Sequence, residues 1–216
     1  DSLRLVVFFF LSPGWPHAMD RTSASSRHRA RPMIRKTPAK SLSTEQVISE
    51  ETRAIIERKT GKVYRLASEL PDQLNLSNSK DLVDVSALGG VQRLNLSWCD
   101  GVVDVSALGG VRTLYLTLCT ALTDVSALAT VKTLRLCWCS GITDVSALGR
   151  VENLVLSCCS GVKDVSALGS VHNLDLNSCA GVEDVSALGK VRSLTLAHCP
   201  GVTDVSALGT VRTLIL

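Results

Sequence analysis

Apolar residues recur along most of this chain with a period of twenty residues. From about residue 70 to residue 216, successive periods carry close variants of the pattern L-x-L-x-x-C-x-G-V-x-D-V-S-A-L, which is complete between Leu94 and Leu108. The alternation in L-x-L predicts a short strand with both Leu side chains inward, and D-V-S-A-L predicts a short helical or 3₁₀ turn that ends at glycine. A fixed period of this length predicts a solenoid, in which each repeat stacks on the next one.

The repeats predict eight parallel strands with seven D-V-S-A-L turns between them. The strands are expected at Leu74, Leu94, Leu114, Leu134, Leu154, Leu174, Leu194 and Leu214. No polar cap follows the last strand, and an uncapped terminal repeat exposes apolar surface. The sequence therefore favours a solenoid domain, residues 70–216, that is truncated at its C-terminus.

A helix is expected before the first repeat, within an N-terminal helical cap spanning residues 43–69. Ser43 and Gln46 have the spacing of a capping box, and Gly61 supplies a stop signal. Between them, apolar residues from Val47 to Ile56 recur at helical spacing. Because the first repeat of a solenoid would otherwise expose its core, we expect this helix to cover it.

Residues 1–42 form a separate segment, which we expect to be disordered or to serve in targeting. The apolar run from Leu5 to Leu11 is too short to span a bilayer. It is either the core of a signal peptide or not native coding sequence, and we favour the second. From Arg21 to Lys40 there are seven Lys or Arg and no acidic residue, typical of a transit peptide or a solvated tail. The expected location is cytoplasmic, or secreted or organellar if Leu5–Leu11 is a true signal.

Six cysteines occupy the same position in successive repeats and are expected to point inward as buried structural thiols: Cys99, Cys119, Cys139, Cys159, Cys179 and Cys199. A column of parallel side chains suits neither disulfide geometry nor a tetrahedral zinc site, so we expect free thiols, no metal and no cofactor. Free thiols fit a reducing compartment. Cys137 and Cys158 fall on outward positions. They are reactive or metal-binding groups, or plain surface residues; we favour the last because no nearby group is expected to lower their pKa.

Seven aspartates form a second column: Asp84, Asp104, Asp124, Asp144, Asp164, Asp184 and Asp204. We expect each to cap its turn by accepting a hydrogen bond from the N–H of the Ser two residues later. Calcium binding is the alternative, but the G-G-x-G-x-D pattern is absent. The glycine column that includes Gly101 is expected to provide positive φ at a corner, although Ala121 interrupts it.

The repeat pattern resembles the leucine-rich-repeat family, in which Cys or Asn follows the second Leu of L-x-L by three positions. Its D-V-S-A-L half is similar to the D-I-S-P-L of internalins, and its C-x-G-V-T-D half resembles the repeats of F-box adaptors. Short-repeat proteins of protists, algae and giant viruses are also similar. The resemblance implies an α/β solenoid shaped as a horseshoe or arc, with strands on the concave face and 3₁₀ turns on the convex face. The repeat is shorter than in internalins and F-box adaptors, and no F-box is visible, so their partners do not carry over.

Exposed aromatic residues and Arg are the usual centres of protein interfaces, and they gather on the outward positions of three successive repeats. We therefore expect a partner-binding site at Trp98, Tyr115, Leu118, Arg135 and Trp138. The alternative is that the two Trp pack on neighbouring loops. Charge is nearly balanced within the repeats, which argues against nucleic-acid binding by the array.

The sequence therefore predicts a protein-protein interaction module that binds through its concave face. Two alternatives stay open: a substrate-recruiting or regulatory region of a larger enzyme such as a ubiquitin ligase, and a secreted or surface adhesin. The four His residues are scattered, and the chain contains no nucleophile elbow, phosphate-binding loop or dinucleotide fingerprint. We accordingly expect no catalytic residue.

Overall fold

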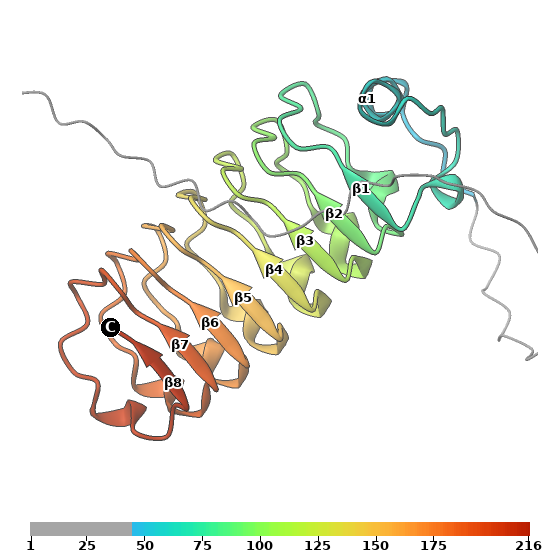
Figure 1. The fold of residues 1–216 in the computed structure, drawn as a ribbon. Helices are drawn as coiled ribbons and strands as arrows, with labels where there is room; N and C mark the ends of the chain where they lie inside the picture. Colours follow the sequence, from blue (N-terminus) through green and yellow to red (C-terminus); the bar gives the residue numbers. More distant parts are fainter. Residues whose placement is uncertain (1–44) are drawn as a thin grey trace, which may run out of the picture. The chain divides into compact units, whose positions relative to one another are not determined.

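The computed structural model describes residues 45–216. The predictions made for residues 1–44, including the capping role of Ser43, lie outside the described residues. One sheet of eight parallel strands, each of three residues, runs in sequence order along the array (Figure 1). The strands are β1 (Gln73–Asn75), β2 (Arg93–Asn95), β3 (Thr113–Tyr115), β4 (Thr133–Arg135), β5 (Asn153–Val155), β6 (Asn173–Asp175), β7 (Ser193–Thr195) and β8 (Thr213–Ile215).

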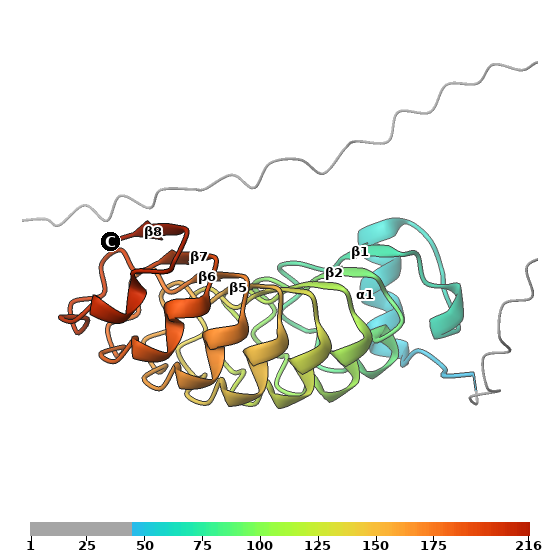
Figure 2. The same cartoon turned by 90° about the horizontal axis from the view of Figure 1, so that it is seen from below.

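Each strand pairs with the next in a register of twenty residues, so that Leu74, Leu94 and Leu114 lie side by side. We call one twenty-residue unit a rung, and the same position in successive rungs a column. Seven 3₁₀ turns cross the opposite side of the array, at Ser86–Leu88, Ser106–Gly110, Ser126–Thr130, Ser146–Arg150, Ser166–Ser170, Ser186–Lys190 and Ser206–Leu208. The strands line the inner side of the arc and the turns its outer side (Figure 2). The predicted solenoid is confirmed.

A single apolar core runs the length of the array, between the strands and the turns. Both Leu side chains of L-x-L point into it, as Leu94 and Leu96 show, and both are fully buried. The Val and Leu residues of the turns close the core from the other side, for example Val105 and Leu108. Each rung packs only on its neighbours, as in other solenoids. The contacts between rungs are alike because every rung supplies a similar set of apolar groups.

Helix α1 (Glu50–Thr60) covers the first rung, but it begins later than the sequence predicted. Its N-cap is Ser49, whose hydroxyl accepts from the Thr52 N–H at 3.4 Å. Gln46 lies before the helix and not in its first turn as predicted, because the chain is still extended there: Val47 forms an antiparallel bridge with Leu66. The predicted stop is correct, since Gly61 has a left-handed backbone with φ of 70°.

The helix is fixed to the first rung by apolar and polar contacts. Ile55 and Ile56 are buried in the common core. The Thr52 hydroxyl, also buried, donates to the Asp84 carbonyl at 2.7 Å, and the Lys59 ammonium donates to the Ser77 carbonyl at 2.7 Å. These contacts cover apolar surface that the first rung would otherwise present to water. Over residues 45–216, no helix has the length and apolar character needed to cross a membrane.

Candidate functional site

The residue before each column cysteine, and Asn78 before Ser79 in the first rung, has a left-handed backbone, with φ between 58° and 65°. This turn column consists of Asn78, Trp98, Leu118, Trp138, Cys158, Ser178 and His198. The strands end three residues earlier, so Trp98 and its equivalents lie in a turn and not on outward strand positions as we expected. Left-handed backbone is unusual for residues other than glycine, and rarest for bulky ones. The column therefore places large side chains at a strained corner beside the sheet.

Two tryptophans dominate the exposed part of the turn column. Trp98 is 54% exposed and Trp138 is 56% exposed, whereas Leu118 between them is half-buried. Main-chain hydrogen bonds hold these corners in line: the Trp98 N–H donates to the Thr117 carbonyl at 2.8 Å, and the Leu118 N–H donates to the Cys137 carbonyl at 2.8 Å. The three apolar side chains thus extend from three consecutive rungs.

Tyr115 and Arg135 lie on the neighbouring strands β3 and β4, directly opposite one another in the parallel register. Both are half-buried, and both follow a buried Leu, so they lie on the outward side of the sheet. With the three turn residues they occupy rungs two to four. We call this set the aromatic patch: Trp98, Tyr115, Leu118, Arg135 and Trp138.

The glycines after the column cysteines do not have the positive φ that the sequence suggested. They are needed because neighbouring rungs approach closely: a Cβ on Gly101 would lie 2.8 Å from the Leu82 carbonyl oxygen. The same clash recurs at Gly161, where the distance to the Ile142 oxygen would be 2.6 Å. The glycine column therefore sets how tightly rungs stack. Ala121 shows that one methyl group can be tolerated at this position.

Each column cysteine is buried and donates its thiol to a carbonyl of the preceding rung. The acceptor is the second Leu of L-x-L; Cys159, for example, donates to the Leu136 oxygen at 2.8 Å, and Cys99 donates to the Leu76 oxygen at 3.3 Å. Desolvation by burial raises the pKa of Cys119 to about 12 and that of Cys139 to about 11, against an opposing effect of main-chain hydrogen bonds. All eight cysteines are free thiols. Thiols with such raised pKa values are poor nucleophiles at neutral pH.

Thiol labelling checks this arrangement. Under native conditions we expect Cys137 and Cys158, which are only partly buried, to react first, and the six column cysteines to be protected. Denaturation without reductant should then expose all eight, because burial and not bonding protects them. Mass spectrometry of the labelled chain gives the order. A need for reductant would mean that disulfides form, contrary to the structure.

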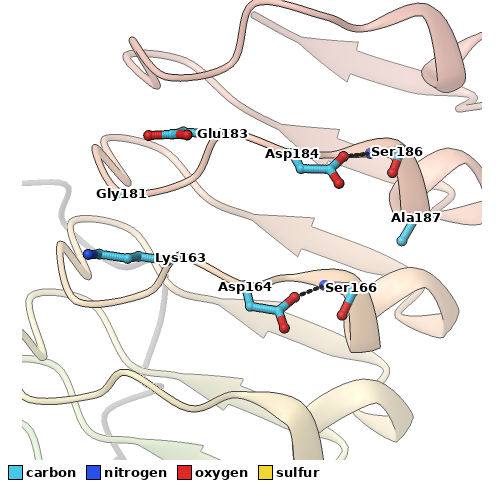
Figure 3. Close-up of a pocket in the computed structure, with 8 residues that line it drawn as sticks. All are labelled: Lys163, Asp164, Ser166, Gly181, Glu183, Asp184, Ser186 and Ala187. Carbon is cyan, nitrogen blue, oxygen red and sulfur yellow. Dashed lines mark hydrogen bonds between the residues drawn. The ribbon is translucent and has the colours of Figure 1, made fainter.

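Each column aspartate accepts a hydrogen bond from the main-chain N–H of the Ser two residues later. The seven distances lie between 2.8 and 2.9 Å; Asp164 with Ser166 and Asp184 with Ser186 are drawn in Figure 3. The aspartate lies one residue before the N-cap, which is a Val in every turn. The main-chain N–H and the hydroxyl of Ser166 hold the pKa of Asp164 below its usual value of 3.8.

A shallow hollow of about 420 Å³ lies on the surface between two neighbouring rungs, beside these aspartates (Figure 3). It is lined by Lys163, Asp164, Ser166, Gly181, Glu183, Asp184, Ser186 and Ala187. A smaller hollow recurs at the next rung, between Asp184 and Asp204. Both hollows lie between stacked rungs, and their aspartates, Asp164, Asp184 and Asp204, already accept hydrogen bonds from the turns. Across residues 45–216, no group of three His, Cys, Asp or Glu side chains is placed to hold a metal ion.

The aspartates should make stability depend on acid pH. The pKa values of these carboxyls are lower in the folded chain than in the unfolded one. Their contribution to the stability of the fold is therefore fully present above the pKa of the unfolded chain, near 4, and is lost as the pH falls through their pKa in the folded chain. Replacing Asp124, Asp144 and Asp164 together by Asn keeps the Oδ1 acceptor but removes the titration. We expect this variant to lose less stability than the parent between about pH 4 and pH 2. Urea melts across this range test the slope; equal slopes would contradict the role of the column.

One outward column was not predicted from the sequence. It begins each strand and carries a chain of side-chain hydrogen bonds: the Asn153 amide donates to the Thr133 hydroxyl at 3.3 Å, and the Asn173 amide donates to the Asn153 oxygen at 2.6 Å. The signal was present in the sequence, as Thr, Asn or Ser at one position of six successive repeats. These polar groups border the aromatic patch on the sheet.

Among solved structures, internalin F from Listeria monocytogenes matches with a TM-score of 0.56 and 23% identity over 76% of this chain. The chain has the leucine-rich-repeat fold. This chain spans about half, 54%, of the internalin F chain that it matches. Internalin C2 from the same species matches with a TM-score of 0.48 and 19% identity, over 76% of this chain and 92% of its own. No protein-family model matches, and no curated protein is significantly similar in sequence.

Proposed function

We propose that this leucine-rich-repeat array is a protein-protein interaction module, and that a macromolecular partner binds through the aromatic patch. The observation that supports this most is the exposure of Trp98 and Trp138, each more than half accessible to water. Adjacent apolar side chains on an open surface are typical of interaction sites, and Trp, Tyr and Arg are the residues that most often dominate binding energy.

The strain of the turn column supports the same proposal. A left-handed backbone costs a non-glycine residue roughly 1–2 kcal/mol, and Asn is better tolerated there than Trp or Leu. Asn78 occupies this position in the first rung, so the fold itself does not require an aromatic residue. A function at Trp98 and Trp138 explains why large apolar side chains are kept at a strained and exposed corner.

Capture experiments test the proposal. The intact chain should retain a protein partner from a lysate of its source, and the double variant Trp98→Ala/Trp138→Ala should lose it. The matched control is Asn177→Ala/His198→Ala, which changes two outward residues of the polar rungs and should retain the partner. Retention by the tryptophan variant together with loss by the control would place the site on the polar rungs instead.

A further inference from the structure

Positive and negative charges are nearly balanced in number in the array, but most of the cations and the column aspartates lie at different positions of each rung. Residues 70–216 contain ten Lys or Arg and thirteen Asp or Glu. Six of the ten cations lie at two positions just before the strands: Arg112, Lys132, Arg150, Lys190, Arg192 and Arg212. We call these six residues the basic ridge. The aspartate column lies instead where the chain enters the 3₁₀ turns, before the buried Val residues.

The backbone stacks the ridge directly, rung upon rung. The N–H of Lys132 donates to the Arg112 carbonyl at 3.1 Å, and the N–H of Arg212 donates to the Arg192 carbonyl at 3.1 Å. Neighbouring main chains in such a ladder are about 4.8 Å apart. All six side chains of the ridge are exposed. Long cationic side chains are therefore held in two close groups along one edge of the sheet.

No cation of the ridge forms a salt bridge within the described part of the chain. Among residues 45–216 the single ion pair joins Arg53 and Glu50 on helix α1, so none of the ridge cations has a carboxylate within 4.0 Å. Like charges at this spacing repel one another, and the repulsion falls when an anionic group binds between them. The ridge also borders the face of the aromatic patch, since Arg112 and Lys132 each precede by three residues a patch residue, Tyr115 or Arg135.

We propose that the basic ridge binds an acidic segment of the protein partner and so orients that partner on the aromatic patch. The inference rests on the proposed function, because it adds the partner's chemistry to the same face. Complementary charge beside an apolar centre raises the rate of association and fixes orientation more than it raises affinity. A partner of this kind carries two groups of Asp or Glu residues that flank an apolar segment or lie along it.

The pattern of the ridge favours an acidic protein over a nucleic acid. Glu152 lies in the ridge column between Lys132 and His172 and divides the cations into two groups. A phosphodiester chain carries a charge on every nucleotide and would meet this carboxylate, whereas a polypeptide can place a neutral or basic residue opposite it.

Binding of a fluorescein-labelled oligo-glutamate peptide to the full chain tests the ridge. We expect salt-dependent binding that weakens at least about tenfold in Lys190→Gln/Arg192→Gln/Arg212→Gln. The matched control, Lys62→Gln/Lys80→Gln/Lys163→Gln, removes three exposed cations outside the ridge and should bind as the parent does. A second variant, with the seven cations of residues 21–40 changed to Gln, measures the contribution of that segment.

Each outcome decides between alternatives. Equal losses in the ridge and control variants would overturn the ridge as a site, and loss only in the variant of residues 21–40 would assign acidic partners to that segment. Tighter binding of an oligothymidylate of similar length would favour a nucleic-acid partner. The variant Trp98→Ala/Trp138→Ala should bind the peptide normally. If that variant still captures the partner, the aromatic patch is refuted as the binding site. The peptide result for the basic ridge is unaffected by that outcome.

Discussion

Replacing Leu156 by Asp should unfold the middle of the array. Leu156 is completely buried. Its N–H donates to the Asp175 carbonyl at 2.8 Å, and its carbonyl accepts the Cys179 thiol at 3.1 Å. A carboxylate at this position would be buried without a partner between two rungs of Leu side chains, at a cost of several kcal/mol. Thermal melts should show a large loss of stability, and hydrogen exchange should rise first in the rungs on either side.

The control for this prediction is Asn95→Asp on strand β2. The Asn95 Oδ1 atom accepts from the Ser97 N–H at 3.0 Å, and Asp175 already makes the same contact, with Asn177 at 2.9 Å, four rungs later. We therefore expect little change in stability from Asn95→Asp. Equal thermal shifts for the two variants would mean that the inward and outward positions of the strands are wrongly assigned.

Truncating Trp138 to Ala should weaken partner binding by about 2 kcal/mol or more while the fold stays intact. Trp138 is 56% exposed, so its loss removes little from the core. Trp138→Asn should lose binding equally and should also stabilise the chain, by up to about 1 kcal/mol, because Asn tolerates left-handed backbone better than Trp. Calorimetric titration with the captured partner and thermal melts measure the two effects separately.

The polar rungs provide the comparison for Trp138. His198→Ala and Asn177→Ala should each cost far less binding, since neither residue belongs to the apolar centre. The opposite ranking would place the site in the rungs of β6 and β7. If neither set of variants mattered, the outer turns or the segment Arg21–Lys40 would become the candidates.

The repeat explains why the solenoid could be predicted from the sequence. A twenty-residue period in L-x-L requires the same strand in every repeat, and burial of Leu94 and Leu96 follows from alternation. The hydrogen bond between each Asp and the second residue after it is local, so D-x-S was enough to suggest it. Local patterns repeated in register leave few alternative structures.

What could not be predicted depends on contacts between distant parts of the chain. The start of helix α1 was misplaced because Val47 pairs with Leu66, a contact that no local capping signal reveals. The role of Gly101 depends on a carbonyl of the neighbouring rung. Alternation also does not show where a strand ends, so Trp98 was expected on the strand although its left-handed backbone places it in the turn.

Because the register is uniform, the distance between exposed side chains such as Trp98 and Trp138 changes only by whole rungs when the chain gains or loses repeats. Removing the unit from Thr113 to Lys132 would join two equivalent positions and leave every contact between rungs of the same kind as before. Trp98 and Trp138 would then occupy neighbouring rungs, closer by one strand spacing of about 4.8 Å. Duplication of a unit would separate them by the same amount. Gain or loss of a single unit can therefore change which partners fit this face without any substitution in the core.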